Sequence, residues 1–219
     1  MRGKLIVFEG IEGAGKTTQM QQTQDWLSRK EQGKTSPRYV IVTREPGGTA
    51  LGTELRQLLL AGGQSRQLAN YSSLHDRTEL LLYAADRAQH IEEVLKPHLE
   101  QGAIILCDRY TDSTFAYQGY GRRINLNFID QLNQIATGGL ESDLTLWLDV
   151  EVEMGQARTR KRGTSDRMEQ ADLAFHQRVQ QGFAELATAY PQRIVRIDAN
   201  AGENEVQQQI QSILLKWLF

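Results

Sequence analysis

The chain has 219 residues, enough for one domain with a full hydrophobic core. Its 25 basic residues are balanced by 27 acidic ones, so no general positive field draws it to nucleic acid or to an acidic membrane. The apolar runs reach only the length of a strand, and the first residues lack the apolar core of a signal peptide. We therefore expect a cytoplasmic protein with neither nucleic acid nor membrane as a partner.

Five short apolar runs are typical of buried strands, and helical patterns alternate with them. The runs are Leu5–Phe8, Tyr39–Thr43, Ala103–Cys107, Leu144–Leu148 and Arg193–Ile197. Helices are expected at about 17–30, from about 50, at 74–99, 111–119, 126–137, 171–189 and 206–217, with a loop at 61–72 and a disturbance near Pro97. This alternation predicts an α/β fold, a five-stranded parallel sheet with helices on both faces and ligands at the carboxyl ends of the strands.

A glycine-rich segment joins the first strand to the first helix with the pattern G-x-x-x-x-G-K-T, from Gly10 to Thr17. Its glycines let backbone N–H groups turn toward an anion at the positive end of a helix. Lys16 can reach the outer phosphates of a nucleotide, and the Thr17 hydroxyl can bind the Mg²⁺ ion that bridges them. The segment predicts a nucleoside triphosphate site built from Gly10, Gly13, Ala14, Gly15, Lys16, Thr17 and Thr18.

Charged residues follow the other strands, at the edge where ligands are expected. Arg44, Arg56 and Arg109 are candidates to hold the phosphate of an acceptor or the charge of a transferring group, although any one of them alone could be a surface arginine. Asp108 and Asp149 each end a strand, and each could organise Mg²⁺ and its water shell. The residues alone do not separate these two carboxylates.

A basic stretch from Arg158 to Arg167 follows the fourth strand and contains Gly163. A solvated helix face is the ordinary interpretation of such a run. Phosphoryl transfer, however, needs positive charge delivered as the site closes, and the glycine and small residues suit a hinged segment. We expect a mobile lid at about 156–168.

Two further features concern an acceptor molecule. Glu12 is an awkward neighbour for a triphosphate unless it accepts a hydrogen bond, and a sugar hydroxyl is a sensible donor. Tyr83 and Arg87 lie four residues apart on one helix face, where the ring could stack on a base and the guanidinium could bond its carbonyl edge. On periodicity alone, core packing of Tyr83 is favoured over this role. The four histidines form no metal-binding pattern.

Together these motifs resemble the thymidylate kinase family, whose members move the γ-phosphate of ATP to dTMP. The resemblance runs nearly end to end and rests on Phe8–Thr18, Thr43–Thr49, Leu82–Arg87, Asp108–Tyr110 with Ser113 and Ala116–Gly119, and Leu148–Asp149. It implies a single P-loop kinase domain over residues 1–219, with three α/β/α layers, ATP as phosphate donor, Mg²⁺ as cofactor and a homodimer whose interface could lie on the 74–99 helix.

The resemblance also implies roles for individual residues. Glu12 would bond the deoxyribose 3′-hydroxyl, and Asp108 would organise the metal. Tyr83 stands where the family usually has a phenylalanine stacked on thymine, so its extra hydroxyl needs a polar neighbour or water. The resemblance further implies that the dTMP phosphate contacts Arg44, Arg56 and Arg109. The base would contact Arg87 and Thr114, and the sugar would contact Tyr117. Ser113 and Gln118 would also belong to the dTMP site.

The family divides according to whether its catalytic arginine lies in the phosphate loop or in the lid. Here the loop residues Ile11–Ala14 include no arginine, so the resemblance implies that the lid supplies it, with Arg162 the first candidate and Arg158 the second. Two alternatives stay open: a kinase of another nucleoside monophosphate, such as dUMP, and a nucleotide-binding switch. The lack of N-K-x-D and D-x-x-G segments argues against the switch.

Overall fold

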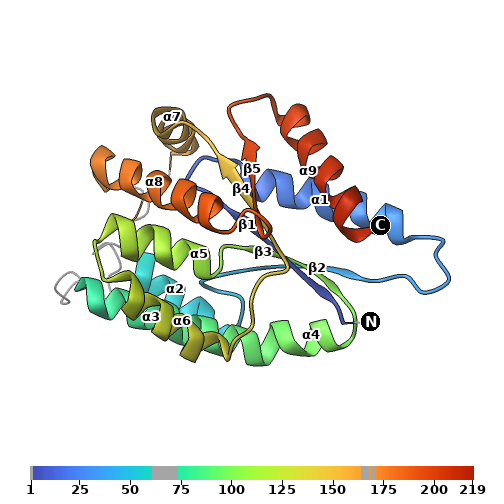
Figure 1. Ribbon diagram of the computed structural model, residues 1–219, viewed down its shortest axis with the longest axis horizontal. Helices are drawn as coiled ribbons and strands as arrows, with labels where there is room; N and C mark the ends of the chain where they lie inside the picture. Colours follow the sequence, from blue (N-terminus) through green and yellow to red (C-terminus); the bar gives the residue numbers. More distant parts are fainter. Residues whose placement is uncertain (1, 61–73, 164–167, 169–170) are drawn as a thin grey trace.

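The predicted five-stranded parallel sheet is confirmed in a computed structural model that describes residues 2–60, 74–163, 168 and 171–219 (Figure 1). The strands run in the order β2-β3-β1-β4-β5, and every neighbouring pair is parallel. Their bounds are β1 Lys4–Glu9, β2 Val40–Arg44, β3 Ile104–Asp108, β4 Leu144–Asp149 and β5 Ile194–Asp198. The central strand β1 therefore carries the glycine-rich segment into the middle of the sheet edge.

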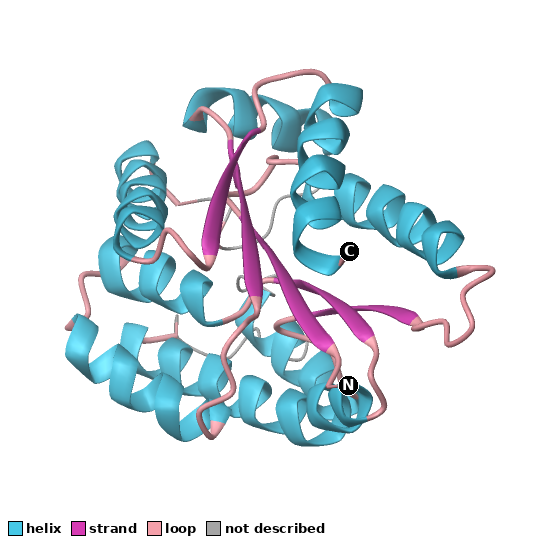
Figure 2. Ribbon diagram, turned by 45° about the vertical axis from the view of Figure 1, so that its right-hand side comes forward, coloured by secondary structure: helices cyan, strands magenta, loops and turns pink. Residues whose placement is uncertain are grey.

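Helices cover both faces of the sheet, as expected (Figures 1 and 2). On one side lie α1 (Lys16–Glu31) and α9 (Glu203–Leu218). The helices that contribute to the other side and to the edge of the site are α2 (Ala50–Leu60), α3 (Asp76–His90), η1 (Ile91–Leu95), α4 (Lys96–Glu100), α5 (Thr111–Thr114), η2 (Phe115–Gly121), α6 (Leu126–Thr137), α7 (Val152–Arg162) and α8 (Leu173–Ala189). None of the described helices is both long enough and apolar enough to span a bilayer.

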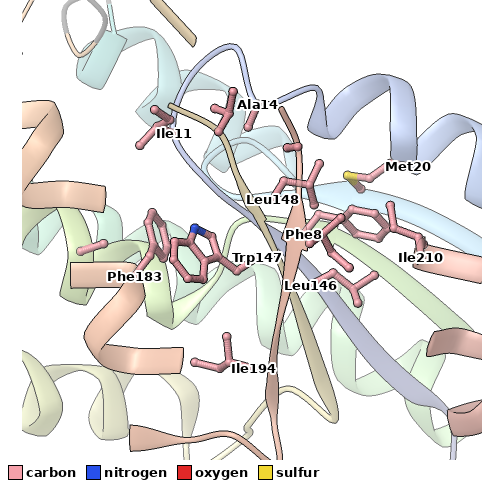
Figure 3. Close-up of a cluster of buried hydrophobic side chains, with 14 of the residues drawn as sticks. Phe8, Ile11, Ala14, Met20, Leu146, Trp147, Leu148, Phe183, Ile194 and Ile210 are labelled. Carbon is pink, nitrogen blue, oxygen red and sulfur yellow. The ribbon is translucent and has the colours of Figure 1, made fainter. Parts of the chain in front are cut away.

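Alternation of side chains along the strands divides the core between the two faces. Figure 3 shows Trp147 of β4 pointing toward Phe183 of α8, whereas Phe8 of β1 points toward Met20 and Ile210 on the other side. The rings of Trp147 and Phe183 are stacked, with centroids 6.3 Å apart. The strands are thus held from both sides, and their carboxyl ends form a fixed base for the loops that follow.

The long helix expected at 74–99 is continuous but not uniform. It consists of α3, the π-helical turn η1 and α4. Pro97 lacks an N–H and its ring excludes the carbonyl four residues earlier, and a π turn is one way for a helix to absorb such a conflict. The irregular turn therefore lies just before the proline rather than in the last turn.

One strand differs from its predicted environment. The run Tyr39–Thr43 was expected to be a buried strand, but β2 lies at the edge of the sheet and is only partly covered, with Val42 exposed. An apolar run reports strand propensity and not the position of the strand in the sheet. The loop expected at 61–72 lies outside the described residues.

Candidate active site

A cavity of about 680 Å³ opens at the carboxyl ends of β1 and β3. It brings together segments that are far apart in the chain, as predicted from their positions after strands. Of the residues predicted to form the site, the cavity is lined by Glu12, Gly13, Gly15, Lys16, Thr17, Thr18, Arg44, Arg56, Tyr83, Arg87, Asp108, Arg109, Ser113, Thr114, Tyr117, Gln118 and Arg158. Gly10 and Ala14 belong to the loop that shapes it but are not part of the lining.

The glycine-rich loop turns sharply between β1 and α1. Gly10, Gly13 and Gly15 all have positive φ values, of 140°, 77° and 90°, which side chains with a Cβ rarely adopt. Gly15 directly precedes the first residue of α1, so the positive end of that helix faces the cavity. The Nζ atom of Lys16 donates to the carbonyl oxygens of Gly10 and Ile11, at 3.0 and 3.2 Å, which keeps the ammonium group inside the loop. Burial lowers the pKa of Lys16, with Arg109 acting in the same direction.

The loop also packs closely against α7. A Cβ on Gly13 would clash with the backbone of Gly155, and a Cβ on Gly155 would lie 2.7 Å from the Glu12 carbonyl oxygen. Helix α7, which carries the basic stretch, is therefore anchored directly on the loop. Gly155 was not singled out from the sequence, although a glycine inside a helical pattern is a known sign of close packing.

Glu12 accepts hydrogen bonds from within the protein. Its carboxylate lies 2.7 Å from Nη2 of Arg109 and 2.8 Å from the hydroxyl of Tyr117. Burial acts to raise the pKa of Glu12, but the positive charges of Arg109 and Lys16, with the Tyr117 hydroxyl, outweigh it and the net pKa is lowered. Glu12 is thus a carboxylate that is held in place at the wall of the cavity.

Arg109 is held in an uncommon backbone conformation, with φ of 70° directly after β3. Glu9, at the end of β1, fixes the backbone beyond it by accepting from the N–H groups of Tyr110 and Ser113, at 2.8 and 3.1 Å, and from the Ser113 hydroxyl at 2.6 Å. Burial raises the pKa of Glu9 to about 7. Sequence reasoning missed Glu9, although a carboxylate at the end of an apolar strand could have drawn notice.

Arg87 is almost fully buried, and most of its donors are used inside the protein. Its guanidinium donates to Glu45, Thr114, Asn133 and the carbonyl oxygen of Tyr110, at 2.8 to 3.0 Å. These bonds use four of the five N–H groups that an arginine carries. Arg87 still lines the cavity, and these partners fix the orientation of its guanidinium there.

The two residues that accompany Arg87 in this wall are placed differently. Tyr83 is half-buried and lines the cavity, so the core-packing alternative for its ring is wrong. Gln118 is buried, and its amide donates to Glu79 at 2.8 Å. This wall of the cavity therefore combines the ring of Tyr83 at its surface with polar side chains that are held by hydrogen bonds within the protein.

The two carboxylates that the residues alone left unresolved are clearly different. Asp108 lines the cavity, and its buried Oδ1 atom has no hydrogen-bond partner among the described residues. Asp149 lies outside the cavity lining and accepts from Gln180 and Arg196, at 3.0 and 2.7 Å. A buried carboxylate oxygen without a partner fits a bound cation or its water, since such a group is otherwise costly. Asp108 therefore fits Mg²⁺ better than Asp149, whose carboxylate is paired within the protein, and Thr17 lines the same cavity as Asp108.

The basic stretch approaches the loop from α7. Nη1 of Arg158 donates to the carbonyl oxygens of Gly13 and Ala199, at 3.3 and 3.2 Å, and Arg158 lines the cavity. Arg162 ends α7 and Gly163 follows it with φ of 79°. The side chain of Arg162 and most of the predicted lid beyond Gly163 lie outside the described residues.

The arginines predicted to hold an acceptor phosphate come from three different elements. Arg44 ends β2 and Arg109 follows β3, whereas Arg56 extends from α2 and donates to the carbonyl oxygen of Pro46 at 2.9 Å. All three line the cavity. Guanidinium groups are suited to bind a phosphate, and of the three Arg109 is also paired with the Glu12 carboxylate.

A glycine-rich loop at the end of the central strand, facing arginines from neighbouring strands across one cavity, defines a P-loop protein of the nucleotide kinase type. A family model described as Thymidylate kinase matches residues 8–210. A thymidylate kinase of Nostoc punctiforme is 59% identical over 98% of this chain and 96% of its own length. Thymidylate kinases of a Cyanothece species and of Thermosynechococcus vestitus are 58% and 50% identical, over 98% and 97% of this chain and 94% and 87% of their own lengths. The chain belongs to the thymidylate kinase family.

Proposed function

We propose that this protein transfers the γ-phosphate of ATP to dTMP, giving dTDP and ADP. The observation that carries the proposal is the single cavity that runs from the phosphate loop at Lys16 to the base wall at Tyr83 and Arg87. A donor triphosphate on the loop and an acceptor nucleotide on that wall would place the two phosphates side by side. Positioning of this kind supplies much of the catalysis in phosphoryl transfer.

In this proposal the acceptor phosphate oxygen attacks the γ-phosphate in line, without a covalent enzyme intermediate. Lys16 and the N–H groups of the loop hold the donor, and Arg44, Arg56 and Arg109 hold the acceptor phosphate. Glu12, already fixed by Arg109 and Tyr117, accepts a hydrogen bond from the 3′-hydroxyl of the sugar. Tyr117, beside it, would leave no space for a 2′-hydroxyl, which favours deoxyribose.

Thr17 and Asp108 are the residues that would hold Mg²⁺, in part through water. When bound, the ion would neutralise charge on the donor phosphates. Among the described residues no cluster of three or more His, Cys, Asp or Glu side chains could form a complete metal site. In kinase sites Mg²⁺ commonly takes most of its ligands from phosphate and water.

The remaining positive charge is proposed to come from the lid at about 156–168, through Arg162 or Arg158. Arg158 already touches the phosphate loop, and Gly163 offers a hinge at the end of α7. Residues 1–219 would act as one P-loop kinase domain in the cytoplasm, where the lone buried thiol of Cys107 stays reduced.

The test is an ADP-release assay over a panel of nucleoside monophosphates with ATP and Mg²⁺. The proposal requires kcat/KM to be highest for dTMP. A preference for dUMP or another acceptor would replace it with a related kinase activity. If ATP is hydrolysed at a rate that no acceptor changes, and the bound nucleotide alters binding to a protein partner, the protein is instead a nucleotide-binding switch.

A homodimer forms a second part of the proposal. Helices α2 and α3 pack together and expose Leu51, Leu58 and Leu81, which are 51%, 41% and 48% exposed. Apolar side chains grouped on adjacent helices suit a subunit interface. Leu81→Glu should produce a monomer in sedimentation velocity, whereas Leu215→Glu, on α9 at the other side of the molecule, should not. A Leu81→Glu protein that remains dimeric would exclude this face.

A further inference from the structure

A buried chain of hydrogen bonds runs behind the base wall of the cavity. The Thr43 hydroxyl lies 2.7 Å from Nε2 of His90, and Nδ1 of His90 lies 2.9 Å from Oε1 of Glu45. The other carboxylate oxygen of Glu45, Oε2, accepts from Nε of Arg87 at 2.8 Å. His90, Glu45 and Arg87 are all at most 4% exposed. The four residues come from β2, the loop after it and α3, so the chain ties these elements together.

The carboxylate fixes the direction of the bond between His90 and Glu45, and the direction of the Thr43 bond then follows for the neutral ring. An ionised carboxylate only accepts, so Nδ1 of His90 donates to Glu45. In the neutral ring Nε2 then accepts from the Thr43 hydroxyl. Glu45 has one oxygen held by His90 and the other by Arg87, and its own position therefore depends on the imidazole. A buried carboxylate that lost one of these donors would reorient toward the remaining ones or toward water.

The loop after β2 rests on the same histidine. A Cβ on Gly48 would clash with the His90 ring, so that glycine lets the loop lie flat against the imidazole. The neighbouring N–H of Gly47 donates to Asp86 of α3 at 3.0 Å. Glu45 and Pro46, between this contact and β2, line the cavity. The His90 ring thus limits how closely the loop after β2 approaches α3, and it holds the Glu45 carboxylate that orients Arg87.

We propose that His90 is a positioning residue for acceptor recognition, which acts by holding Glu45 so that the guanidinium of Arg87 presents its remaining edge to the base of dTMP. The inference rests on the proposed function, since it takes Arg87 as the group that contacts the base. His90 touches neither substrate. Its effect reaches the base only through Glu45.

Two substitutions of His90 test the hydrogen bonds of its two ring nitrogens one at a time. In His90→Asn the side-chain amide takes the place of Nδ1 and keeps the donor to Glu45. In His90→Gln the amide reaches the place of Nε2 and keeps a partner for Thr43 but loses the bond to Glu45. The expected result is a KM for dTMP that rises about tenfold in His90→Gln, as for the loss of one buried hydrogen bond, and about twofold or less in His90→Asn. The KM for ATP should stay unchanged in both.

A merely structural histidine would give a different pattern. Both variants would then lower the melting temperature and either leave the KM for dTMP unchanged or raise it equally, and each of these outcomes overturns the inference. His98→Gln is the matched control, because among the described residues His98 hydrogen-bonds the carbonyl oxygen of Val94 on the same long helix and its ring contacts Tyr39, which does not line the cavity. Arg87→Lys, which keeps the charge but loses the planar fork, tests the underlying function. If the KM for dTMP is unchanged in Arg87→Lys, Arg87 does not contact the base and the proposed role of Arg87 is wrong. If that KM is raised in Arg87→Lys but normal in His90→Gln, only the inference about His90 is wrong.

A measurement on the unaltered protein covers the case in which His90→Gln fails to fold. With ¹⁵N-labelled histidine, the ring signals of His90 should shift when dTMP saturates the protein and stay in place with a non-hydrolysable ATP analogue. If the chemical shifts of the His90 ring nitrogens do not change when dTMP binds, the inference is overturned.

Discussion

Nη2 of Arg109 lies 2.7 Å from Oε1 of Glu12, so the loop after β3 and the phosphate loop after β1 are joined by an ion pair at the cavity wall. The hydroxyl of Tyr117 donates to the same carboxylate, and Arg109 also lies over the Tyr117 ring at 4.8 Å. Glu12 of the phosphate loop is therefore tied directly to two residues that follow β3 in the chain. Under the proposed function, these three side chains would couple the placement of the donor to that of the acceptor.

The first prediction concerns that ion pair. Glu12→Gln keeps the size of the side chain but removes the charge that holds Arg109 and accepts the sugar hydroxyl. Since hydrogen bonds to charged groups contribute about 1.5 to 3 kcal/mol, the KM for dTMP should rise at least tenfold, with a much smaller change for ATP. Steady-state kinetics with each substrate varied in turn provides the measurement. Glu100→Gln, at an exposed end of α4, is the control. An equal rise in both KM values would contradict the assignment to the acceptor.

The strands and the phosphate loop were predictable because each depends on local sequence. A buried strand needs an apolar run, and a loop that approaches phosphate needs glycines at positive φ, as at Gly13 and Gly15. Motifs that follow parallel strands meet at one edge of the sheet, which is why Arg44, Asp108 and Glu12 were expected together. The strand order was not predictable in the same way, since no local pattern states that β2 lies at the edge.

The unpredicted part of the site consists of residues that act on distant partners. Glu9 binds groups 104 residues further along the chain, and His90 binds Glu45 across 45 residues. The sequence does not indicate which distant residue will hydrogen-bond a buried polar side chain, because that depends on the fold. The same applies to Asp108 and Asp149, which look alike in sequence and differ only in what surrounds them.

That difference leads to the second prediction. Asp108→Asn removes the charge of a carboxylate whose buried oxygen has no hydrogen-bond partner in the described part of the chain, so the Mg²⁺ concentration for half-maximal rate should rise about tenfold or more, and kcat should fall. Asp149→Asn should lower stability because Arg196 loses its partner, and should leave the Mg²⁺ dependence unchanged. Mg²⁺ titrations of the two variants at saturating nucleotide decide between them. The opposite pattern would make Asp149 the carboxylate that organises the metal.

The third prediction is a pH dependence of stability. Burial raises the pKa of Asp86 from 3.8 to about 6, because Oδ1 accepts only the Gly47 N–H and Oδ2 is buried without a partner among the described residues. The folded protein therefore binds a proton here that the unfolded chain has released. The stabilising contribution of Asp86 is complete below about pH 3.8 and is lost as the pH rises through about 6.

The measurement is urea unfolding of the unaltered protein and of Asp86→Asn, which cannot titrate. The free energy of unfolding of the unaltered protein should decrease relative to the variant by about 2 kcal/mol between pH 4 and pH 7. Glu31 supplies a control of opposite sign, because its pKa is lowered by hydrogen bonds and charge from Arg38 and Lys34, which outweigh its burial. The same comparison with Glu31→Gln should show relative stability that increases with pH. A flat difference for Asp86 would show that its folded-state pKa is not raised.

The fourth prediction concerns the arginine that completes the site. Arg162 and Arg158 lie one helical turn apart on α7, and Arg158 is already bonded to the carbonyl oxygens of Gly13 and Ala199. An arginine committed to backbone carbonyls is suited to hold the lid against the phosphate loop. An arginine nearer the hinge at Gly163 can move with the lid toward the transferring phosphate. Arg162→Ala should therefore lower kcat about 10³-fold with little change in either KM.

Arg158→Ala should act differently, because the bonds it loses join α7 to the loop. Its expected effect is mainly a higher KM for ATP, with a smaller loss of kcat. Arg29→Ala, at an exposed position near the far end of α1, should change neither constant. A normal kcat in Arg162→Ala together with a 10³-fold loss in Arg158→Ala would transfer the transition-state role to Arg158. The loop contact to Gly13 would then be a resting position that the guanidinium leaves when both nucleotides bind.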